Sequence, residues 1–432
     1  MPDAKTEEFD VIVVGGGPSG LFSAIFARER GARVLLVEKG NQLGRKLGIS
    51  GGGRCNVTNA KPLPELMDNI PGNARFLHSA LARFGNTDIM RFFEGLGIGL
   101  KEEDRGRVFP RSDKASTVVS ALVNSVYERG VDVWTDTPVR GLCQEDGAVT
   151  GIRLANGNRV SAKAVIVATG GCSVPKTGST GDAYPWAKSA GHTIVDPYPT
   201  EVPLTSNDWF IRERTLQGLS LKAVPVTLWY NETKRLTVEE GDLIFTHFGL
   251  SGPVALRCSH YVSTSLRRKK SGNLTASVDA LPLMASEALA ETWRRWRRDE
   301  PRKQVGTLCR QILPDRLADV IIAETGIPSS SQVANLNNDM ITRLVKNTKS
   351  FAVHITGTLP LSQATVTGGG VSVKEIDPRT MASKLVRGLY FCGEVMDVHA
   401  HTGGYNITVA FSTGHLAGES AAEFALDPVC FT

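Results

Sequence analysis

The sequence predicts an α/β fold in which one parallel-sheet domain is interrupted by a β-rich insertion. Residues 9–14 (FDVIVV) and 32–38 (ARVLLVE) are near-continuous apolar runs, which are typical of parallel strands buried on both faces. A helical stretch between them completes a β-α-β unit. After about residue 197 apolar and polar residues alternate, and after about residue 356 glycine-rich segments between buried strands resume. We therefore expect the chain to leave its first domain and later return to it.

Composition restricts the kinds of protein that this chain can be. Of its 432 residues 41% are hydrophobic, which suffices for two or three domains. The net charge of +5 is a mild excess that favours an anionic ligand without implying nucleic acid. The longest apolar runs are far shorter than the ~20 residues of a membrane span, and the acidic start is unlike a secretory signal. We expect a cytoplasmic protein that has no membrane partner.

Seven cysteines are scattered along the chain and none forms a CxxC pair. This spacing argues against a dithiol redox motif and against a close-spaced zinc site, so we expect no metal. The cysteines are residues 55, 143, 172, 258, 309, 392 and 430.

A G-x-G-x-x-G motif lies between the first strand and the first helix. Gly15 permits the tight turn, Gly17 allows backbone to approach a pyrophosphate, and Gly20 allows the helix to pack closely on the strand. Pro18 and Ser19 complete the motif at the helix N-terminus, whose positive end faces phosphate charge. Glu38, at the end of the second strand, is placed to bind a ribose diol. The motif predicts a dinucleotide but does not separate NAD from FAD.

A second glycine run, GRKLGISGGGRCNVTN at residues 44–59, follows the ribose acid. Gly51, Gly52 and Gly53 would let backbone amides meet a phosphate or a flavin edge, because no Cβ intervenes. The cations of this segment, Arg45, Lys46 and Arg54, would face a pyrophosphate. The alternative is a flexible loop, but such loops rarely interleave Arg, Cys and Asn with glycines.

Two later segments complete the expected cofactor site. A buried strand ends in Thr169, Gly170 and Gly171, another place of close backbone approach, and Asp182 is interpreted as the N-cap of a helix over 183–190.

Residues 389–418 form the last of these segments. Glu394 and Asp397 are acceptors suited to ribityl hydroxyls, and a helix is expected to open at about Tyr405, after Gly403 and Gly404. Its N-terminus would stabilise the negative charge that develops on the pyrimidine end of a reduced flavin. An NAD-only dehydrogenase does not need this return of the chain, so FAD is favoured as the resident cofactor.

The insertion contains two kinds of secondary-structure pattern. Strand patterns include LKAVPVTLWYN, and residues 283–348 are helical. In the segment ETWRRWRRDEPRK, Leu289, Trp293 and Trp296 form one helical stripe, which predicts a buried face with solvated arginines opposite. An RNA-binding or membrane-binding patch is the alternative. The boundaries that we expect are 1–196 with 356–432 for the FAD-binding domain, 197–282 with 349–355 for a β-rich substrate domain, and 283–348 for a helical cap.

Long motifs in addition resemble one family. GGGPSG, GRKLGISGGGRCNVTN, FPRSDKA, TGSTGDAY, FTHFGLSGP, ATVTGGGV, RTMASKL and GEVMD…TGGYN…AFSTG are similar to BaiN-like or YhiN-like (aminoacetone-oxidase-like) bacterial FAD-dependent flavoproteins, over residues 10–420. The resemblance implies a Rossmann-like FAD domain of the two-dinucleotide-fold type, an inserted β-barrel-like lobe, a helical cap and non-covalent FAD. It implies no single substrate, since members are linked to amine oxidation and to enone-type steroid reduction. The FAD contacts that it implies are Gly15, Gly17, Ser19, Glu38, Lys39, Arg45, Gly52, Gly53, Cys55, Asn56, Thr169, Gly170, Gly393, Glu394, Asp397, Gly404, Asn406 and Ile407.

Candidates for proton transfer lie near the flavin-facing helix. His399, His401 and Tyr405 could move a proton or bind a substrate carbonyl, although local packing explains them equally well. Cys55 has no partner cysteine nearby, so a packed thiol is the better interpretation.

Other candidates for substrate or anion binding also have a purely structural explanation. His247 and Ser251 are candidates for substrate contact or for a structural turn, and Arg107, Arg111 and Lys114 for an anion site or a solvated loop.

We expect an FAD-dependent oxidoreductase that exchanges hydride between flavin N5 and a small organic substrate. NAD(P)H is the expected reductant and would use the same cavity transiently, because there is no second G-x-G-x-x-G. The alternatives are an amine oxidase that passes electrons to O2, a tRNA-modifying type of flavoprotein and a non-catalytic flavin sensor. Nucleic acid is expected to be an improbable partner, and the oligomeric state stays open.

Overall fold

The structure is a computed structural model that describes residues 8–268 and 272–427. It divides into two compact units, one of Met1–Tyr198 with Leu361–Thr432 and one of Pro199–Pro360. Cys430 lies outside the described residues. None of the helices described combines the length and the apolar character needed to cross a membrane.

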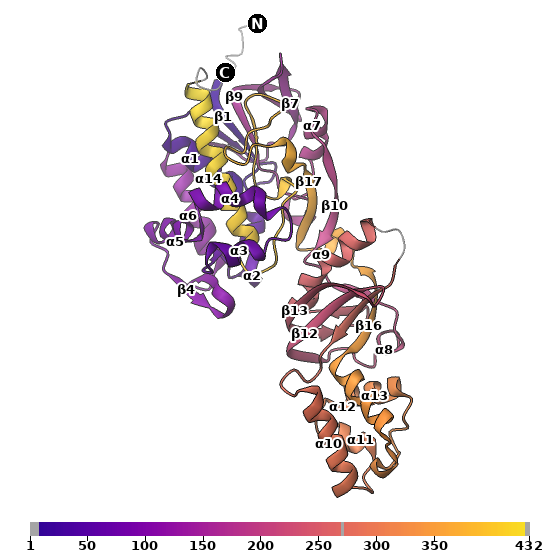
Figure 1. Ribbon diagram of the computed structural model, residues 1–432. Helices are drawn as coiled ribbons and strands as arrows, with labels where there is room; N and C mark the ends of the chain where they lie inside the picture. The colour runs from indigo at the N-terminus through magenta and orange to yellow at the C-terminus, as the bar shows by residue number, and fades with distance from the viewer. Residues whose placement is uncertain (1–7, 269–271, 428–432) are drawn as a thin grey trace. The chain divides into compact units, whose positions relative to one another are not determined.

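The first unit is built on a seven-stranded sheet of order β6-β2-β1-β9-β8-β7, with β18 also paired to β9. Figure 1 labels β1, β7 and β9 of this sheet. β6, β2, β1, β9 and β18 are parallel, whereas β7, β8 and β9 are antiparallel. The alternation and turns of residues 131–167 predict this antiparallel meander. The meander is continuous with the parallel sheet because β9 belongs to both. The strands are β1 (Glu8–Val14), β2 (Val34–Val37), β6 (Asp132–Trp134), β7 (Val139–Glu145), β8 (Ala148–Leu154), β9 (Arg159–Val167) and β18 (Leu389–Phe391).

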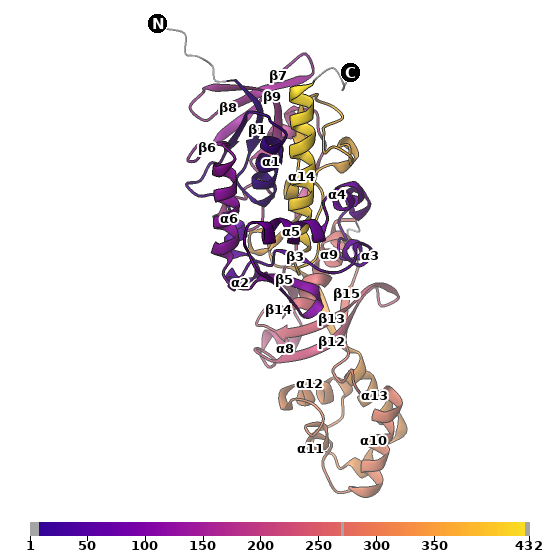
Figure 2. The same ribbon diagram turned by 90° about the vertical axis from the view of Figure 1, so that its left-hand side faces the viewer.

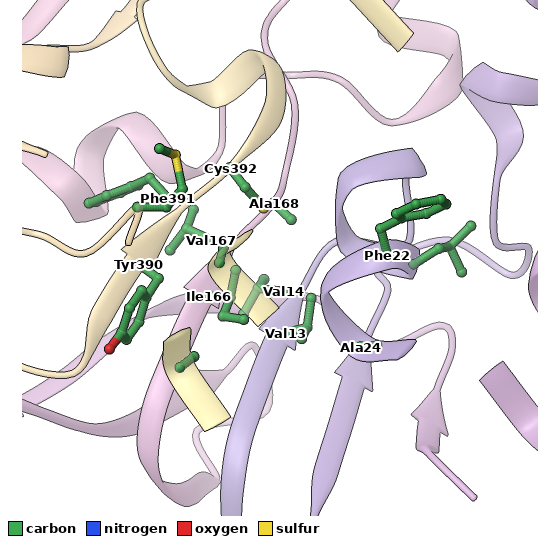
Figure 3. Packing of buried hydrophobic residues seen from close by; sticks show 14 of the residues in the cluster. Val13, Val14, Phe22, Ala24, Ile166, Val167, Ala168, Tyr390, Phe391 and Cys392 are labelled. Atoms are coloured by element: carbon green, nitrogen blue, oxygen red, sulfur yellow. The ribbon is translucent and has the colours of Figure 1, made fainter. Parts of the chain in front are cut away.

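The core of this unit lies between the sheet and two helices. Figure 3 shows Val13 and Val14 of β1 beside Ile166 and Val167 of β9, which are their partners in the parallel register. Helices α1 (Pro18–Glu29) and α14 (Tyr405–Leu426) pack on each other, as Figure 1 shows with α14 in yellow. Apolar burial on both faces of the sheet explains the near-continuous apolar strands.

The first unit also contains further helices and two small sheets. A small sheet has the order β3-β5-β4, and β10 pairs with β17. The elements are α2 (Arg45–Gly53), β3 (Thr58–Asn59), α3 (Leu63–Asp68), α4 (His78–Arg83), α5 (Asn86–Gly95), β4 (Leu100–Glu103), β5 (Arg107–Pro110), α6 (Ala115–Glu128), α7 (Ala183–Ser189), β10 (Ile194–Thr200) and β17 (Val366–Val371).

The second unit contains a closed barrel of order β11-β14-β13-β12-β15-β16. Along β12 the side chains of Val224, Val226 and Leu228 are buried in its interior, as their period-two spacing predicts. The elements are β11 (Leu204–Ser206), α8 (Trp209–Arg212), β12 (Ser220–Tyr230), β13 (Lys234–Phe245), β14 (Gly249–Ser251), α9 (Pro253–Arg268), β15 (Leu274–Val278) and β16 (Phe351–Thr358). The expected α/β class with a barrel-like lobe is confirmed.

Four helices follow β15 in the same unit (Figure 2): α10 (Ser286–Asp299), α11 (Val305–Cys309), α12 (Asp315–Thr325) and α13 (Asn338–Lys349). The stripe of Leu289, Trp293 and Trp296 on α10 is buried, so that sequence prediction is confirmed. Compactness groups the barrel and these helices together. Their separation into a substrate domain and a helical cap, with the boundaries given above, remains a proposal.

Candidate functional site

The three motif glycines of the first βα turn have different surroundings. Gly15 has φ +111°, and a Cβ on it would lie 2.6 Å from the Ala168 carbonyl oxygen. A Cβ on Gly20 would lie 1.8 Å from the Gly15 carbonyl oxygen, so this position excludes any side chain. Around Gly17 no atom lies within 4 Å of such a Cβ. Two glycines therefore allow close packing, and the third leaves open space at the N-terminus of α1.

The N-terminus of α1 has the chemistry of an anion site. Gly17 is its N-cap and no side chain caps the helix, while Pro18 fills the first turn, where a missing N–H costs nothing. Glu38 is held beside this turn because its carboxylate accepts hydrogen bonds from the Gly16 and Gly40 amides, each 2.8 Å long. Glu38, the residue predicted to bind the ribose, is thus fixed next to the turn.

The second glycine run forms a left-handed turn at the end of α2. Gly51, Gly52 and Gly53 have φ values of +57°, +69° and +86°, a conformation that side chains rarely adopt. No atom lies within 4 Å of a Cβ built on Gly52 or Gly53. Open space therefore lies beside the exposed backbone at Gly52 and Gly53.

Cys55 follows this turn and is fully buried. Burial raises the pKa of its thiol to about 12, and the hydrogen bond with Ser50 only partly offsets this. The thiolate is unfavourable near neutral pH, so a packed thiol describes Cys55 better than a redox nucleophile.

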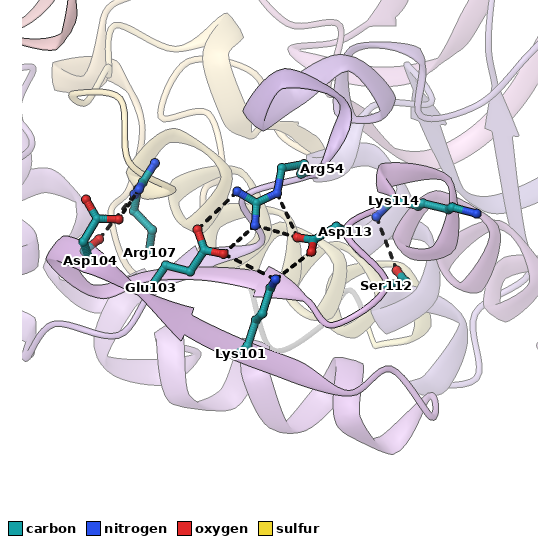
Figure 4. A network of polar contacts seen from close by, with 8 residues as sticks. All are labelled: Arg54, Lys101, Glu103, Asp104, Arg107, Ser112, Asp113 and Lys114. Atoms are coloured by element: carbon teal, nitrogen blue, oxygen red, sulfur yellow. Dashed lines mark hydrogen bonds and ion pairs between the residues drawn. The ribbon is translucent and has the colours of Figure 1, made fainter.

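Arg54 differs from its predicted role as a pyrophosphate ligand. Figure 4 shows its guanidinium bound to the carboxylates of Glu103 and Asp113, which Lys101 also contacts. The guanidinium also stacks 4.1 Å from the centre of the Phe109 ring. The hydrogen bond from Arg54 is the main reason that the pKa of Glu103 is lowered. These contacts connect the glycine turn to the β4–β5 hairpin. The two carboxylates also compensate the charge of Arg54. Arg45 is exposed.

Lys46 and Glu394 form a partly buried ion pair, with the ammonium 2.7 Å from Oε2. Ser173 Oγ and the Thr367 amide donate to Glu394 Oε1 over 3.0 and 2.8 Å, and Lys46 also donates to Ser173 Oγ. Burial opposes ionisation of Glu394, but Lys46 and these donors outweigh it and hold the pKa of the carboxyl below its ordinary value. Both oxygens accept hydrogen bonds within the protein, so Glu394 joins three segments, and its contact with the ribityl hydroxyls stays a prediction. Neither Ser173 nor Thr367 is among the site residues that the sequence predicts.

Residues 169–173, which follow β9, contact the cluster of Lys46, Glu394 and Thr367, since the Ser173 amide donates to Thr367 Oγ1. A Cβ on Gly171 would lie 2.4 Å from Thr367 Oγ1, and Gly170 has φ +72°. The hydroxyl of Thr169 is buried and has no hydrogen-bond partner among the described residues. An unpaired buried hydroxyl is costly, so this atom is available to a ligand.

The prediction for Asp182 is confirmed in its N-cap position and wrong in its capping hydrogen bond. Helix α7 does begin directly after it, but the Asp182 side chain makes no capping hydrogen bond. Instead it accepts from Lys39 Nζ at 2.5 Å and from Thr180 Oγ1. The charge-assisted bond to Lys39 competes with the weaker bond to a backbone amide. Lys39, a predicted cofactor residue, is therefore engaged by this loop.

The C-terminal return places a second helix N-terminus near the glycine turn. Gly404, with φ +96°, is the N-cap of α14, and no side chain caps this helix. A Cβ on Gly404 would lie 2.4 Å from the Thr58 carbonyl oxygen and 2.9 Å from Asn56 Oδ1. That Asn56 oxygen is buried without a partner among the described residues. Gly393, with φ +72°, approaches Ser19 in the first turn.

Asn406 and the two histidines belong to one small structure. The Asn406 side chain bonds the amide and the carbonyl of Ala400 and also the His401 carbonyl. These hydrogen bonds hold the loop of His399 and His401 in place. The sequence predicts Asn406 as an FAD contact and does not predict this structural role. Ile407 packs against the core, and the side chain of Asp397 accepts a hydrogen bond from Asn73.

The predicted proton-transfer residues are all buried. The exposed fractions of His399, His401 and Tyr405 are 2%, 4% and 4%. The His399 ring lies edge-to-face with Tyr198, and the His401 amide donates to the Asn69 carbonyl. In residues 8–268 and 272–427 no group of three or more His, Cys, Asp or Glu side chains is placed to hold a metal ion.

The remaining candidates have different surroundings. Arg107 pairs with Asp104, the Arg111 side chain donates to the Leu100 carbonyl, and Lys114 is exposed. His247 and Ser251 belong to the second unit.

The residues present fit an extended dinucleotide. Two uncapped helix N-termini suit phosphate and flavin charge, and open backbone at Gly17, Gly52 and Gly53 leaves room for a cofactor. The unpaired oxygens of Thr169 and Asn56 would find partners on it.

Comparison with known proteins identifies the family. The model of the "HI0933-like protein Rossmann domain" matches residues 9–420. A protein named ribosomal RNA dihydrouridine synthase from Escherichia coli strain K12 is 33% identical, over 94% of this chain and 96% of its own. A protein named 3-dehydro-bile acid delta(4,6)-reductase from Clostridium scindens is 30% identical, over 95% of this chain and 98% of its own.

A solved structure supports the fold. The 3-ketosteroid delta1-dehydrogenase from Sterolibacterium denitrificans, in complex with 1,4-androstadiene-3,17-dione, matches with a TM-score of 0.52 at 16% identity, over 96% of this chain and all of that chain. From the family match and the full-length relatives, the chain belongs to the HI0933-like family of FAD-dependent oxidoreductases.

Proposed function

We propose that this enzyme uses NAD(P)H to reduce a carbon–carbon double bond conjugated to a carbonyl group. The observation that carries the proposal is that two full-length relatives have names that describe this one bond change. Dihydrouridine is uridine whose ring double bond, conjugated to a carbonyl, has gained two hydrogens. A Δ4,6-reductase of a 3-dehydro steroid likewise reduces double bonds conjugated to the 3-ketone.

Bound FAD supplies the hydride, from N5, and this chain must supply the rest of the site. Hydride addition to the β-carbon moves negative charge to the carbonyl oxygen, and the α-carbon then takes a proton. We assign the proton to His401 or Tyr405, which lie buried beside the N-terminus of α14. Asn406 would position this loop. The contacts proposed for FAD are those of the first βα turn, the glycine turn, Thr169 and the N-terminus of α14.

We propose the uracil ring of RNA as the substrate, in place of the expectation that nucleic acid is an improbable partner. The relatives named as ribosomal RNA enzymes support it, and so does the positive net charge of +5. A steroid enone is the second candidate, because the bile-acid reductase is 30% identical over nearly the full chain. Acting on ribosomal RNA would require the cytoplasmic location that the sequence predicts.

Anaerobic flavin spectroscopy tests the reaction class. We expect NADPH or NADH to bleach the oxidised-flavin absorbance, and unmodified ribosomal RNA to restore it with formation of dihydrouridine, detected by mass spectrometry of digested RNA. Restoration by a 4-en-3-one steroid alone would favour the second candidate. If nicotinamide does not bleach the flavin, while an amine reduces it and O2 reoxidises it, the proposal is wrong.

Variants of the two proton candidates sharpen the test. The residue that donates the proton should lose about 10²-fold or more in the rate of acceptor reduction when changed, in His401→Gln or Tyr405→Phe, while flavin bleaching by nicotinamide persists.

A further inference from the structure

The positive charge of this protein is unevenly distributed. Residues 199–360, which form the second unit, contain 21 Lys and Arg and 16 Asp and Glu, a difference of +5. That difference equals the net charge of the whole chain. The first unit, which contains the dinucleotide motifs, is therefore electrically balanced at the level of its sequence. A surface for a polyanion is better sought on the second unit.

Part of this charge is concentrated on α10 and the turn after it. Arg294, Arg295, Arg298 and Arg302 are exposed, and the buried stripe of α10 lies on the opposite side of the helix. Glu291 pairs with Arg294 and Arg298, whose side chains stay 45% and 61% exposed. Arg295 and Arg302 have no ion pair with any residue of the described ranges. Among the described residues, Glu291 is the carboxylate that pairs with these arginines, while the neighbouring Glu300 pairs with Lys303 and Asp299 is exposed.

We propose that Arg294, Arg295, Arg298 and Arg302, here called the α10 arginine face, bind the phosphate backbone of an RNA. The inference rests on the proposed function, because RNA is the substrate that it assigns. Guanidinium groups bind phosphate with two parallel hydrogen bonds, and surface arginines keep their charge at every physiological pH. Burial of Trp293 and Trp296 anchors the helix, so the arginines are presented from a rigid support.

An RNA fits this face better than a membrane does. An amphipathic helix that binds a bilayer inserts apolar side chains, but the large apolar residues of α10 (Leu289, Trp293 and Trp296) are already buried within the unit. The face offers charge without an apolar anchor. Such a face suits a ligand with regularly spaced phosphates, whose binding depends on counterion release.

The test measures RNA affinity with oxidised enzyme and no nicotinamide, so that turnover plays no part. A fluorescein-labelled fragment of ribosomal RNA is titrated with the full-length holoenzyme at several KCl concentrations. The test variant is Arg295→Ala/Arg298→Ala/Arg302→Ala. The matched control, Arg91→Ala/Arg140→Ala/Arg159→Ala, removes three exposed arginines of the first unit and gives the same net charge.

We expect the α10 variant to bind RNA at least tenfold more weakly at about 0.1 M salt, and the slope of log K against log[salt] to fall by about 2. The control should change affinity by less than twofold. Equal losses in the two triple variants, or no loss in the α10 variant, would overturn the proposal. So would an α10 variant that loses binding to phosphatidylserine vesicles but keeps its affinity for RNA.

A second readout separates this inference from the proposed reaction. Nicotinamide-dependent flavin bleaching and the reduction of a small enone need no RNA surface, so the α10 variant should retain both. If these activities are present but RNA does not bind the wild-type protein, the surface is overturned while the reaction class stands. Equal melting temperatures for the two triple variants would exclude misfolding as the cause of a lost affinity.

Discussion

The centre of the candidate site and the glycine turn of residues 51–53 use the same residue types in opposite ways. At the centre, where the first βα turn meets the segment after β9, a Cβ on Gly20 would meet backbone at 1.8 Å. At the glycine turn, a Cβ on Gly52 would meet nothing within 4 Å. The cations differ similarly, since Lys46 is partly buried with Glu394 whereas Arg54 is in a surface cluster. Close packing thus requires glycine at position 20, whereas open space adjoins Gly52.

The largest effect is expected for Gly20→Ala. The added methyl group would overlap the Gly15 carbonyl oxygen, so α1 would have to move away from β1. We expect a loss of more than about 4 kcal/mol in the free energy of unfolding, measured by urea denaturation.

The control for this variant is Gly95→Ala at the end of α5, where a Cβ meets no atom within 4 Å. It should be neutral or slightly stabilising. A stable Gly20→Ala protein would show that α1 can move to accommodate a methyl group. It would contradict the difference in packing between the centre and the glycine turn.

Next in size is Lys46→Met, which removes the partner of the Glu394 carboxylate. Side-chain exposures of 27% and 20% moderate the cost of the unpaired charge, so we expect about 2 kcal/mol near neutral pH. The pKa of Glu394 is lowered in the folded protein, so its contribution to stability is present above the ordinary carboxyl pKa. That contribution is lost as the pH falls through the lowered value.

Thermal unfolding between pH 3 and pH 8 would measure this dependence. The curves of the wild-type and Lys46→Met proteins should converge at acid pH. A difference independent of pH would mean that Lys46 stabilises the site by packing alone.

A smaller loss of stability is expected for Gly52→Ala, with a separate loss of cofactor. A side chain at φ +69° costs about 1 kcal/mol, but the methyl group would enter the space proposed for FAD. We expect the FAD dissociation constant to rise at least tenfold, measured by fluorescence during apoprotein titration.

The matched control is Gly147→Ala, which has φ +73° and no atom within 4 Å of its Cβ, in the β7–β8 turn. It should lose similar stability and keep its FAD affinity. Equal FAD affinities in the two variants would show that the turn does not approach the cofactor.

The smallest effect on FAD binding is expected for Arg54→Gln. Its charge is already compensated by Glu103 and Asp113, so FAD affinity should change by less than threefold and show little dependence on salt. Isothermal titration of apoprotein with FAD would measure this. A tenfold loss that salt reduces would restore the role that the sequence predicts for Arg54 and would weaken the comparison.

Much of the fold was predictable because it depends on local pattern. The parallel strands, the meander, the alternation along β12 and the tryptophan stripe of α10 follow from apolar spacing. For the site, the spacing of Gly15, Gly17 and Gly20 predicted both the tight turn and the close packing of the helix.

The partners of polar side chains were less predictable. Lys46 meets Glu394 across 348 positions of the sequence, and Ser173 and Thr367 join them without any motif. Asp182 binds Lys39 rather than its own helix, and Asn406 turns back to the histidine loop. Nothing in the local sequence distinguishes these residues from others of the same type.

The sequence by itself determined where backbone must turn tightly or lie bare, because glycine spacing and apolar periodicity act over a few residues. It also determined that the chain binds a dinucleotide, through a motif whose physics is local. Only the tertiary structure decided which charges are compensated and which stay available. A charge selects its partner by distance in space, and the fold sets that distance: it leaves Arg54 engaged by two carboxylates, while Arg295 remains exposed.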